Sequence, residues 1–172
     1  MAAADYICPV PGIVPDEKTY YDFTRLLADR NGFEEAMKEF LGMFDREVFD
    51  AFVCSESFAG MFATALAQKL GKAVVTVRTE GGFPGTVVSE RCVNSSGSSR
   101  IEMRPGCVRP GMKVIVMGDV LATGRTTSAM IRLVENQGGK VIRVGYIAEL
   151  TEYGARKNRV LKRYPFECLA AF

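Results

Sequence analysis

Short apolar runs alternate with helical patterns in the middle and second half of the chain. Each run has the length and composition of a buried strand. The runs are residues 51–55 (AFVCS), 73–77 (AVVTV), 114–117 (VIVM) and 141–147 (VIRVGYI). The helical patterns are residues 58–70, which stop at Gly71, and residues 126–137, which stop at Gly138 and Gly139. Two strand, helix, strand units predict an α/β fold with an open, mostly parallel sheet flanked by helices.

An open sheet of this kind binds its ligands at the carboxyl ends of its strands. We therefore expect the chemistry in the loops that follow Ser55, Val77 and Met117. The serine-rich residues 94–99 (NSSGSS), which lie between the two units, predict a loop.

The first part of the chain contains one clear amphipathic helix. Its apolar residues recur at helical spacing over residues 31–44, and Asn31 with Glu34 would form a capping box at its start. The sequence contains neither internal repeats nor a recognisable linker. We therefore expect its 172 residues to form a single domain, residues 1–172.

Composition excludes several classes of enzyme. The chain has no histidine, which excludes Ser/His/Asp and Cys/His catalytic groups, a His-ligated metal and an imidazole acid or base. The 22 Lys and Arg residues against 20 Asp and Glu give a formal net charge of +2. That charge is too balanced for a protein made mainly to hold nucleic acid. We expect a small-molecule partner, with no nucleic acid and no membrane.

The cysteines and the first residues bear on the compartment. The five cysteines include no C-x-x-C pair of the kind that redox and zinc sites use. The start of the chain lacks the basic segment of a signal peptide, and no apolar run approaches the ~18 residues of a spanning helix. A cytoplasmic protein with reduced thiols fits these features best.

Residues 114–127 (VIVMGDVLATGRTT) combine a buried strand, an acid and a Gly- and Thr-rich turn that opens a helix. Backbone N–H groups of such a turn can converge on one phosphate at the positive end of the helix. The predicted phosphate cradle consists of Ala122, Thr123, Gly124, Arg125 and Thr126. Gly124 would allow close backbone approach, and the threonine hydroxyls, Thr127 included, would add donors. Asp119 would face a ribose diol, so the pattern predicts a phosphorylated sugar as ligand.

A purely structural interpretation stays open for the same residues, because Asp and Thr commonly do no more than cap a helix. The segment matches neither the GxxxxGK[ST] P-loop nor the GxGxxG dinucleotide fingerprint. Kinases and Rossmann dehydrogenases are therefore disfavoured.

The string GDVLATGRT (residues 118–126) resembles the phosphoribosyl-diphosphate (PRPP) motif of type I phosphoribosyltransferases. It is most similar to that of the adenine phosphoribosyltransferase family, usually Asp-Asp-[Val/Leu]-Leu-Ala-Thr-Gly-Gly-Thr. Three further blocks resemble family stretches in the family's order: residues 22–29 (DFTRLLAD), 65–78 (ALAQKLGKAVVTVR) and 144–156 (VGYIAELTEYGAR). The likeness covers nearly the whole chain and implies the type I phosphoribosyltransferase fold, with a small hood at about residues 79–105.

The resemblance implies a Mg²⁺-dependent enzyme of purine salvage that converts adenine and PRPP to AMP and pyrophosphate. By position, the cradle would hold the 5′-phosphate and Asp119 the ribose hydroxyls. Glu56 and Ser57 would form the pyrophosphate loop, with the positive charge of Arg78 nearby. Asp119 and Arg78 are thus the candidate catalytic residues.

The resemblance also implies a base pocket, a metal and a partner. Tyr20 and Tyr21 lie beside the matching N-terminal block, where an aromatic face could stack on a purine or simply pack in the interior. Mg²⁺ would be held mainly by substrate oxygens and water, with no dedicated protein ligand. Family members are usually homodimers, which implies a homodimer here.

Departures from the family pattern fall on functional positions. They are Gly118 for the first acid of the motif, Arg125 for its second glycine, Phe58 for the pyrophosphate-loop arginine, Thr79 and Gly82 where the next block has lysines, and Ser95 for the hood acid. If the hood acid assists proton transfer, help worth roughly 10²- to 10⁴-fold is absent from that position.

These departures leave two classes of function open. One is a divergent purine phosphoribosyltransferase, acting on adenine or on xanthine, guanine or hypoxanthine. The other is a catalytically impaired homologue that binds PRPP or a nucleotide as a sensor. In either class, Thr123→Val or Gly124→Val is expected to abolish phosphoribosyl binding and leave the fold intact.

Overall fold

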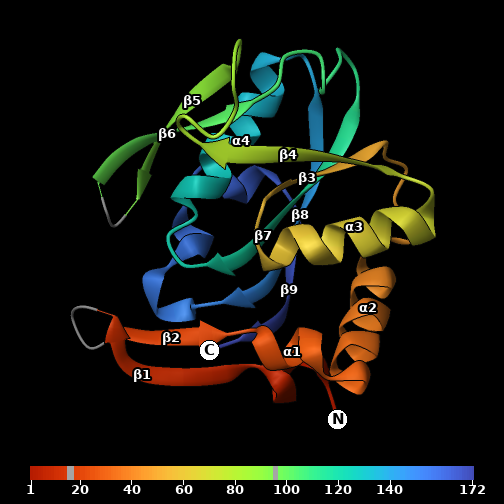
Figure 1. Cartoon of the computed structure of the whole chain (residues 1–172), viewed down its shortest axis with the longest axis vertical. Coiled ribbons are helices and arrows are strands. Elements are labelled where there is room, and N and C mark those ends of the chain that lie inside the picture. Colours follow the sequence, from red (N-terminus) through yellow and green to blue (C-terminus); the bar gives the residue numbers. More distant parts are fainter. Residues whose placement is uncertain (15–17, 95–96) are drawn as a thin grey trace. The chain divides into compact units, whose positions relative to one another are not determined.

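The computed structural model describes residues 1–14, 18–94 and 97–172 (Figure 1). These residues form two compact units, Met1–Arg46 and Glu47–Phe172. The expectation of one domain over residues 1–172 stays a prediction.

The N-terminal unit combines a hairpin with two helices. Strands β1 (Cys8–Val14) and β2 (Lys18–Asp22) pair antiparallel. The helical elements are η1 (Ala3–Tyr6), α1 (Thr24–Ala28) and α2 (Arg30–Phe44). Helix α2 confirms the amphipathic helix predicted over residues 31–44.

The predicted cap of this helix is wrong. Helix α2 starts one residue earlier, and its N-cap is Asp29, whose carboxylate accepts hydrogen bonds from the backbone N–H of Asn31 (2.8 Å) and Gly32 (3.3 Å). Glu34 instead pairs with Arg30 one turn away. A carboxylate placed just before the helix satisfies two of its free N–H groups and takes the position that the sequence pattern assigned to Asn31.

The second unit is built on one seven-stranded sheet, with strand order β5-β6-β4-β3-β7-β8-β9. Strands β4, β3, β7, β8 and β9 run parallel, and β5 and β6 extend the sheet antiparallel. Their bounds are β3 Ala51–Ser55, β4 Ala73–Thr79, β5 Val88–Asn94, β6 Gly97–Met103, β7 Lys113–Leu121, β8 Lys140–Glu149 and β9 Phe166–Ala171. The predicted mostly parallel sheet is confirmed.

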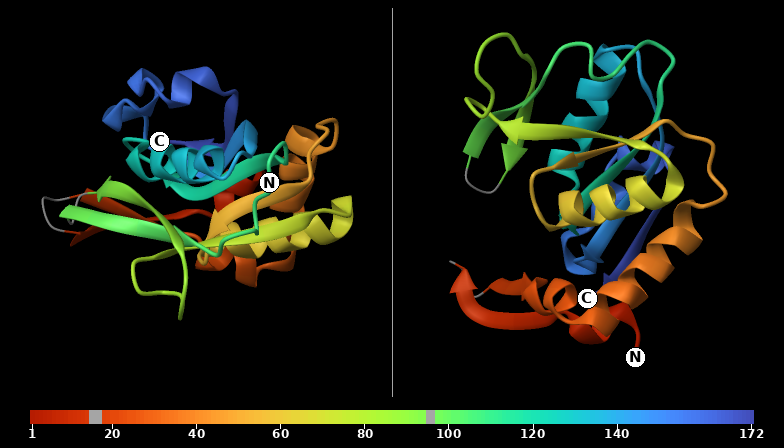
Figure 2. Two further views of the ribbon diagram at one scale, coloured as in Figure 1. Left: turned by 90° about the horizontal axis from the view of Figure 1, so that it is seen from above. Right: turned by 45° about the vertical axis from the view of Figure 1, so that its right-hand side comes forward.

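Two helices connect the central strands. Helix α3 (Phe58–Leu70) leads from β3 to β4, and α4 (Arg125–Asn136) leads from β7 to β8. The two connections leave the adjacent strands β3 and β7 in opposite directions, so right-handed crossovers place α3 and α4 on opposite faces of the sheet (Figure 2). The carboxyl ends of β3 and β7 therefore form a topological switch point, the usual place for a ligand.

The serine-rich loop predicted at residues 94–99 is largely strand. Asn94 ends β5 and pairs with Gly97, the first residue of β6, while Ser95 and Ser96 lie outside the described residues. Within the predicted hood, at about residues 79–105, β5 and β6 thus form a β-hairpin. Cross-strand hydrogen bonds stabilise it where residue composition alone favours a loop.

The core explains why the hairpin stays on the sheet. Cys92, Ile101 and Met103 turn their side chains into the same apolar cluster as Val116 and Ile131, which belong to β7 and α4. After β8, three short turns complete the chain before β9: η2 (Thr151–Tyr153), η3 (Ala155–Lys157) and η4 (Leu161–Arg163). Within the described ranges, no helix has the length and apolar character needed to cross a membrane.

Candidate active site

Two of the three loops expected to carry the chemistry, those after β3 and β7, meet at the switch point. Asp119 on β7 accepts hydrogen bonds on Oδ1 from Ser57 Oγ (2.9 Å) and from the backbone N–H of Ala59 (2.5 Å). Ser57 is the N-cap residue of α3 and also hydrogen-bonds Ser55 through its hydroxyl (2.8 Å). The structure thus brings Asp119 together with the predicted pyrophosphate loop.

Asp119 is largely buried, and its surroundings shift its pKa in two opposing directions. Burial raises the pKa of this carboxyl above its ordinary value, while hydrogen bonds from Ala59, Ser57 and Phe58 oppose the rise. The interpretation of Asp119 as a helix cap is therefore correct in part, because Asp119 does accept hydrogen bonds at the start of a helix. That helix is α3, across the switch point, and not α4, which follows Asp119 in the sequence.

The cradle has the backbone geometry of an anion site. Gly124 adopts the left-handed conformation (φ 74°) as the N-cap of α4, and the first bond of that helix runs from Ser128 N–H to Gly124 C=O (2.9 Å). The N–H groups of Arg125, Thr126 and Thr127 come before that bond, in the first turn of the helix. No carbonyl of the helix accepts from them. They are the donors that a phosphate at this turn would use.

One of the three predicted hydroxyl donors is not available. Thr127 is buried, and its hydroxyl hydrogen-bonds that of Tyr146 on β8, so its predicted role as a phosphate donor is wrong. Thr123 and Thr126 are exposed. Thr126 Oγ1 also accepts a contact from the thiol of Cys92 in the hood hairpin (3.7 Å).

Gly124 is required by packing as well as by conformation. A Cβ at this position would lie 2.3 Å from Leu161 Cδ1 and 3.2 Å from Asn158 Nδ2. The expectation that Gly124→Val leaves the fold intact stays a prediction, and this contact with the buried Leu161 argues against it.

Gly118 stands where the motif has its first acid, and the ring of Tyr146 lies against it. A Cβ on Gly118 would lie 2.7 Å from the ring of Tyr146, its register neighbour on β8. That ring is fully buried, and its hydroxyl is tied to Thr127 on α4. The tyrosine therefore occupies the space that a side chain at position 118 would need.

We expect Gly118→Asp to lower the free energy of unfolding by about 2–4 kcal/mol, because it overpacks this site and buries a carboxylate. The cost is expected to be smaller in a Tyr146→Phe background, where the ring is no longer tied to Thr127. Urea unfolding of the four proteins of this double-mutant cycle measures the difference. Equal costs in both backgrounds would contradict this account.

Arg78 lies beside the predicted pyrophosphate loop, as the resemblance implies, but its guanidinium already pairs with Glu56. Its Nε and Nη2 contact Glu56 Oε1 (2.7 and 2.6 Å), and Nη1 donates to the carbonyl of Gly82 (2.6 Å). The ring of Phe83 stacks under the guanidinium, with its centroid 4.5 Å away. The predicted cation and the predicted pyrophosphate loop are thus adjacent, and a bound pyrophosphate would compete with Glu56 for Arg78.

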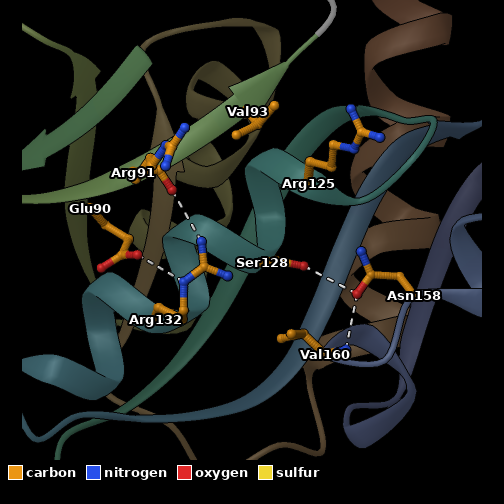
Figure 3. Close-up of a pocket in the computed structure, with 8 residues that line it drawn as sticks. All are labelled: Glu90, Arg91, Val93, Arg125, Ser128, Arg132, Asn158 and Val160. Carbon is orange, nitrogen blue, oxygen red and sulfur yellow. Dashed lines mark hydrogen bonds and ion pairs between the residues drawn. The ribbon is translucent and has the colours of Figure 1, made fainter. Parts of the chain in front are cut away.

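Two cavities adjoin these loops. The smaller, about 300 Å³, lies beside the pyrophosphate loop and includes Glu56, Ser57 and Cys54. Burial next to Asp119 and Glu56 raises the pKa of Cys54 to about 12, so this thiol is not a nucleophile. The larger, about 580 Å³, lies along α4 (Figure 3). It is lined by Glu90, Arg91, Val93, Arg125, Ser128, Arg132, Asn158 and Val160.

The predicted base-pocket residues belong to the N-terminal unit. Tyr20 and Tyr21 are consecutive residues of β2, so their side chains point to opposite faces of the hairpin. They cannot both stack on one face of the same purine. Tyr20 is the more exposed of the two, and the assignment of a base pocket to them stays a prediction.

Three contributors to this site were not predicted from the sequence. Tyr146 fills the space at Gly118, Phe83 stacks on Arg78, and Asn158 contacts the cradle. Tyr146 and Asn158 are distant in sequence from the residues they contact, and Phe83 lies in a loop without periodicity. No local pattern therefore signals any of them.

Comparisons with known proteins agree with this geometry. The model of the phosphoribosyl transferase domain family matches residues 25–168. The adenine phosphoribosyltransferase of Caldicellulosiruptor saccharolyticus is 35% identical over 89% of this chain and 86% of its own length. That of Cutibacterium acnes is 37% identical over 87% of this chain and 81% of its own.

A solved structure extends the agreement to the fold. The adenine phosphoribosyltransferase of Thermoanaerobacter pseudethanolicus superposes with a TM-score of 0.92 at 28% identity, covering 99% of this chain and 98% of the other. The chain therefore belongs to the phosphoribosyltransferase family and, within it, to the adenine phosphoribosyltransferases.

Proposed function

We propose that this protein transfers the 5-phosphoribosyl group of PRPP to adenine, giving AMP and pyrophosphate. The observation that carries the proposal is the contact of Asp119 with Ser57 and the start of α3. It joins the pyrophosphate loop to the strand that leads into the phosphate cradle, so the two ends of one PRPP molecule have adjacent sites. Adenine as the base is supported by the names of the relatives.

In the proposed reaction, the N–H groups at the start of α4 bind the 5′-phosphate, and Oδ2 of Asp119 accepts from a ribose hydroxyl. Ser57, the N-terminus of α3 and Arg78 bind the pyrophosphate. A purine nitrogen bonds to C1 of the ribose as the bond from C1 to the pyrophosphate oxygen breaks. The electron pair leaves with pyrophosphate, and the proton of the attacking nitrogen passes to solvent. Such a reaction needs positioning and charge stabilisation more than a protein nucleophile.

We also propose Mg²⁺ as the cofactor. Asp119 and Glu56 offer the carboxylate oxygens that Mg²⁺ prefers, but Asp119 is occupied by α3 and Glu56 by Arg78. Elsewhere in the described part of the chain, no three Cys, Asp or Glu side chains come close enough to hold a metal. These residues fit an ion held mainly by substrate oxygens and water. When bound, Mg²⁺ would neutralise charge on the departing pyrophosphate.

A second candidate function rests on Arg78. Its guanidinium is committed to Glu56, and Phe58 stands where the motif has an arginine. A protein that binds PRPP or AMP but releases pyrophosphate too slowly would act as a sensor. A homodimer, implied by the resemblance, and a cytoplasmic location, expected from the cysteines and the first residues, stay predictions.

Incubation of the purified protein with Mg²⁺, PRPP and each purine base separates these functions. We expect pyrophosphate release and a matching amount of AMP with adenine, measured by a coupled assay and by chromatography. Turnover with guanine, hypoxanthine or xanthine in place of adenine would assign another base. PRPP or AMP binding in calorimetry without pyrophosphate release from any base would assign the sensor.

A further inference from the structure

Asn158, in the segment between η3 and η4, connects the phosphate cradle to the chain that follows β8. Its Nδ2 donates to the carbonyl of Thr123 (3.1 Å). Its Oδ1 accepts from Ser128 Oγ (3.2 Å) and from the backbone N–H groups of Val160 (3.0 Å) and Leu161 (3.3 Å). Figure 3 shows this side chain facing Ser128 on α4 and the backbone at Val160.

The next carbonyl of the cradle is held as well. The oxygen of Gly124 accepts from both the N–H (2.9 Å) and the hydroxyl (2.8 Å) of Ser128. Asn158 Oδ1 lies 3.2 Å from that same hydroxyl, whose single proton it shares with the Gly124 carbonyl. Asn158 therefore acts on the turn directly at Thr123, while Ser128 holds the carbonyl of Gly124.

Fixing these carbonyls fixes the donors of the cradle. In a planar trans peptide, the C=O and the N–H point in opposite directions. Holding the Thr123 carbonyl towards Asn158 therefore directs the Gly124 N–H away from Asn158. Holding the Gly124 carbonyl towards Ser128 does the same for the Arg125 N–H. Two adjacent N–H groups turned to one side form an anion-binding concavity.

Asn158 is itself rigidly placed. Glu149, fully buried at the end of β8, receives two bonds from Arg156 (3.0 and 2.6 Å), which anchors the segment just before Asn158. Just after it, the buried Leu161 packs against Gly124. Both anchors limit how far the amide can move from the cradle.

We propose that Asn158 is a positioning residue for phosphoribosyl binding. Its amide N–H holds the Thr123 carbonyl so that the backbone N–H of Gly124 points at the 5′-phosphate. The inference rests on the proposed function for the identity of the ligand, and it adds a determinant that lies outside the PRPP motif.

Asn158→Asp tests the donor alone. Aspartate keeps the oxygen that accepts from Ser128, Val160 and Leu161, but it replaces Nδ2 with an oxygen that faces the Thr123 carbonyl. We expect the Kd for ribose 5-phosphate, measured by calorimetry, to rise about 5- to 10-fold, as for one lost hydrogen bond. The thermal unfolding midpoint is expected to stay close to that of the wild type. In the enzyme assay, KM for PRPP should rise while kcat changes little.

Arg159→Gln is the matched control. It makes the same change of net charge at an exposed neighbouring position, without touching the cradle. Its Kd for ribose 5-phosphate is expected to stay within about twofold of the wild type. Pyrophosphate, whose proposed site is at Arg78 and Ser57, serves as a second probe and is expected to bind both variants equally.

The outcomes separate this inference from the proposed function. Weaker ribose 5-phosphate binding in Asn158→Asp alone supports the inference, even if the wild type forms no AMP and the proposed function fails. Equal binding by the two variants overturns the inference, even in an active enzyme. A wild type that binds no ribose 5-phosphate overturns both.

Discussion

Asp119→Asn is expected to lower kcat/KM for PRPP by roughly 10- to 100-fold and to leave the fold stable. The loss corresponds to about 1.5–3 kcal/mol, the range for a hydrogen bond to a charged group. In this variant the amide oxygen can still accept from Ser57 and Ala59, whereas the amide nitrogen cannot accept from a ribose hydroxyl. Steady-state kinetics over a range of PRPP concentrations measure the effect.

Measuring the unfolding midpoint together with activity should separate the role of the Asp119 charge from its structural role. Asp119→Ala removes the oxygen that α3 and Ser57 contact, so we expect it to lower both activity and the unfolding midpoint. The asparagine variant is expected to lower activity alone. An asparagine variant with wild-type kinetics would show that the carboxylate serves only to cap α3.

The pH dependence of stability follows from the burial of Asp119, which raises the pKa of this carboxyl above 3.8. A carboxyl with a raised folded-state pKa stabilises the protein fully below its unfolded pKa, and that contribution is lost as pH rises through the folded pKa. Asparagine does not titrate. The unfolding midpoint of the wild type should therefore fall relative to that of Asp119→Asn as the pH rises above the ordinary pKa of an aspartate carboxyl.

Gly124→Ala is expected to have the largest effect on stability. Alanine must adopt a left-handed conformation, which costs about 1–2 kcal/mol, and its Cβ would overlap Leu161 Cδ1 at 2.3 Å, which adds about 1–3 kcal/mol. For a chain of this length, such a loss lowers the unfolding midpoint by about 5–15 °C. Calorimetric or circular-dichroism melting measures it.

Gly71→Ala provides the matched control. Gly71 also has a left-handed conformation (φ 64°) at a helix end, but a Cβ there would have no neighbour within 4 Å. It therefore reports the conformational cost alone, about 1–2 kcal/mol. The difference between the two variants measures the contact with Leu161, and equal melting points would contradict the crowding at Gly124.

Local patterns predicted the central elements of the fold well. Residues 58–70 and α3 agree at both ends, because an apolar helical pattern and a terminal glycine act within a few residues. The strand predicted at 114–117 is correct but too short, since β7 continues through Gly118 and Asp119 to Leu121. Asn94 and residues 97–99 were wrongly predicted as a loop, because the antiparallel ladder outweighs their composition.

Local patterns were enough to predict the alternation of strands and helices, the turn at Gly124 and the acid that precedes it. Periodicity, capping and turn chemistry act over a few residues, so they can be read along the chain. The contacts of Asp119 with α3, of Tyr146 with the space at Gly118 and of Asn158 with the cradle became visible only in the folded chain. These contacts join residues brought together by strand pairing and helix packing, and no spacing in the sequence encodes them.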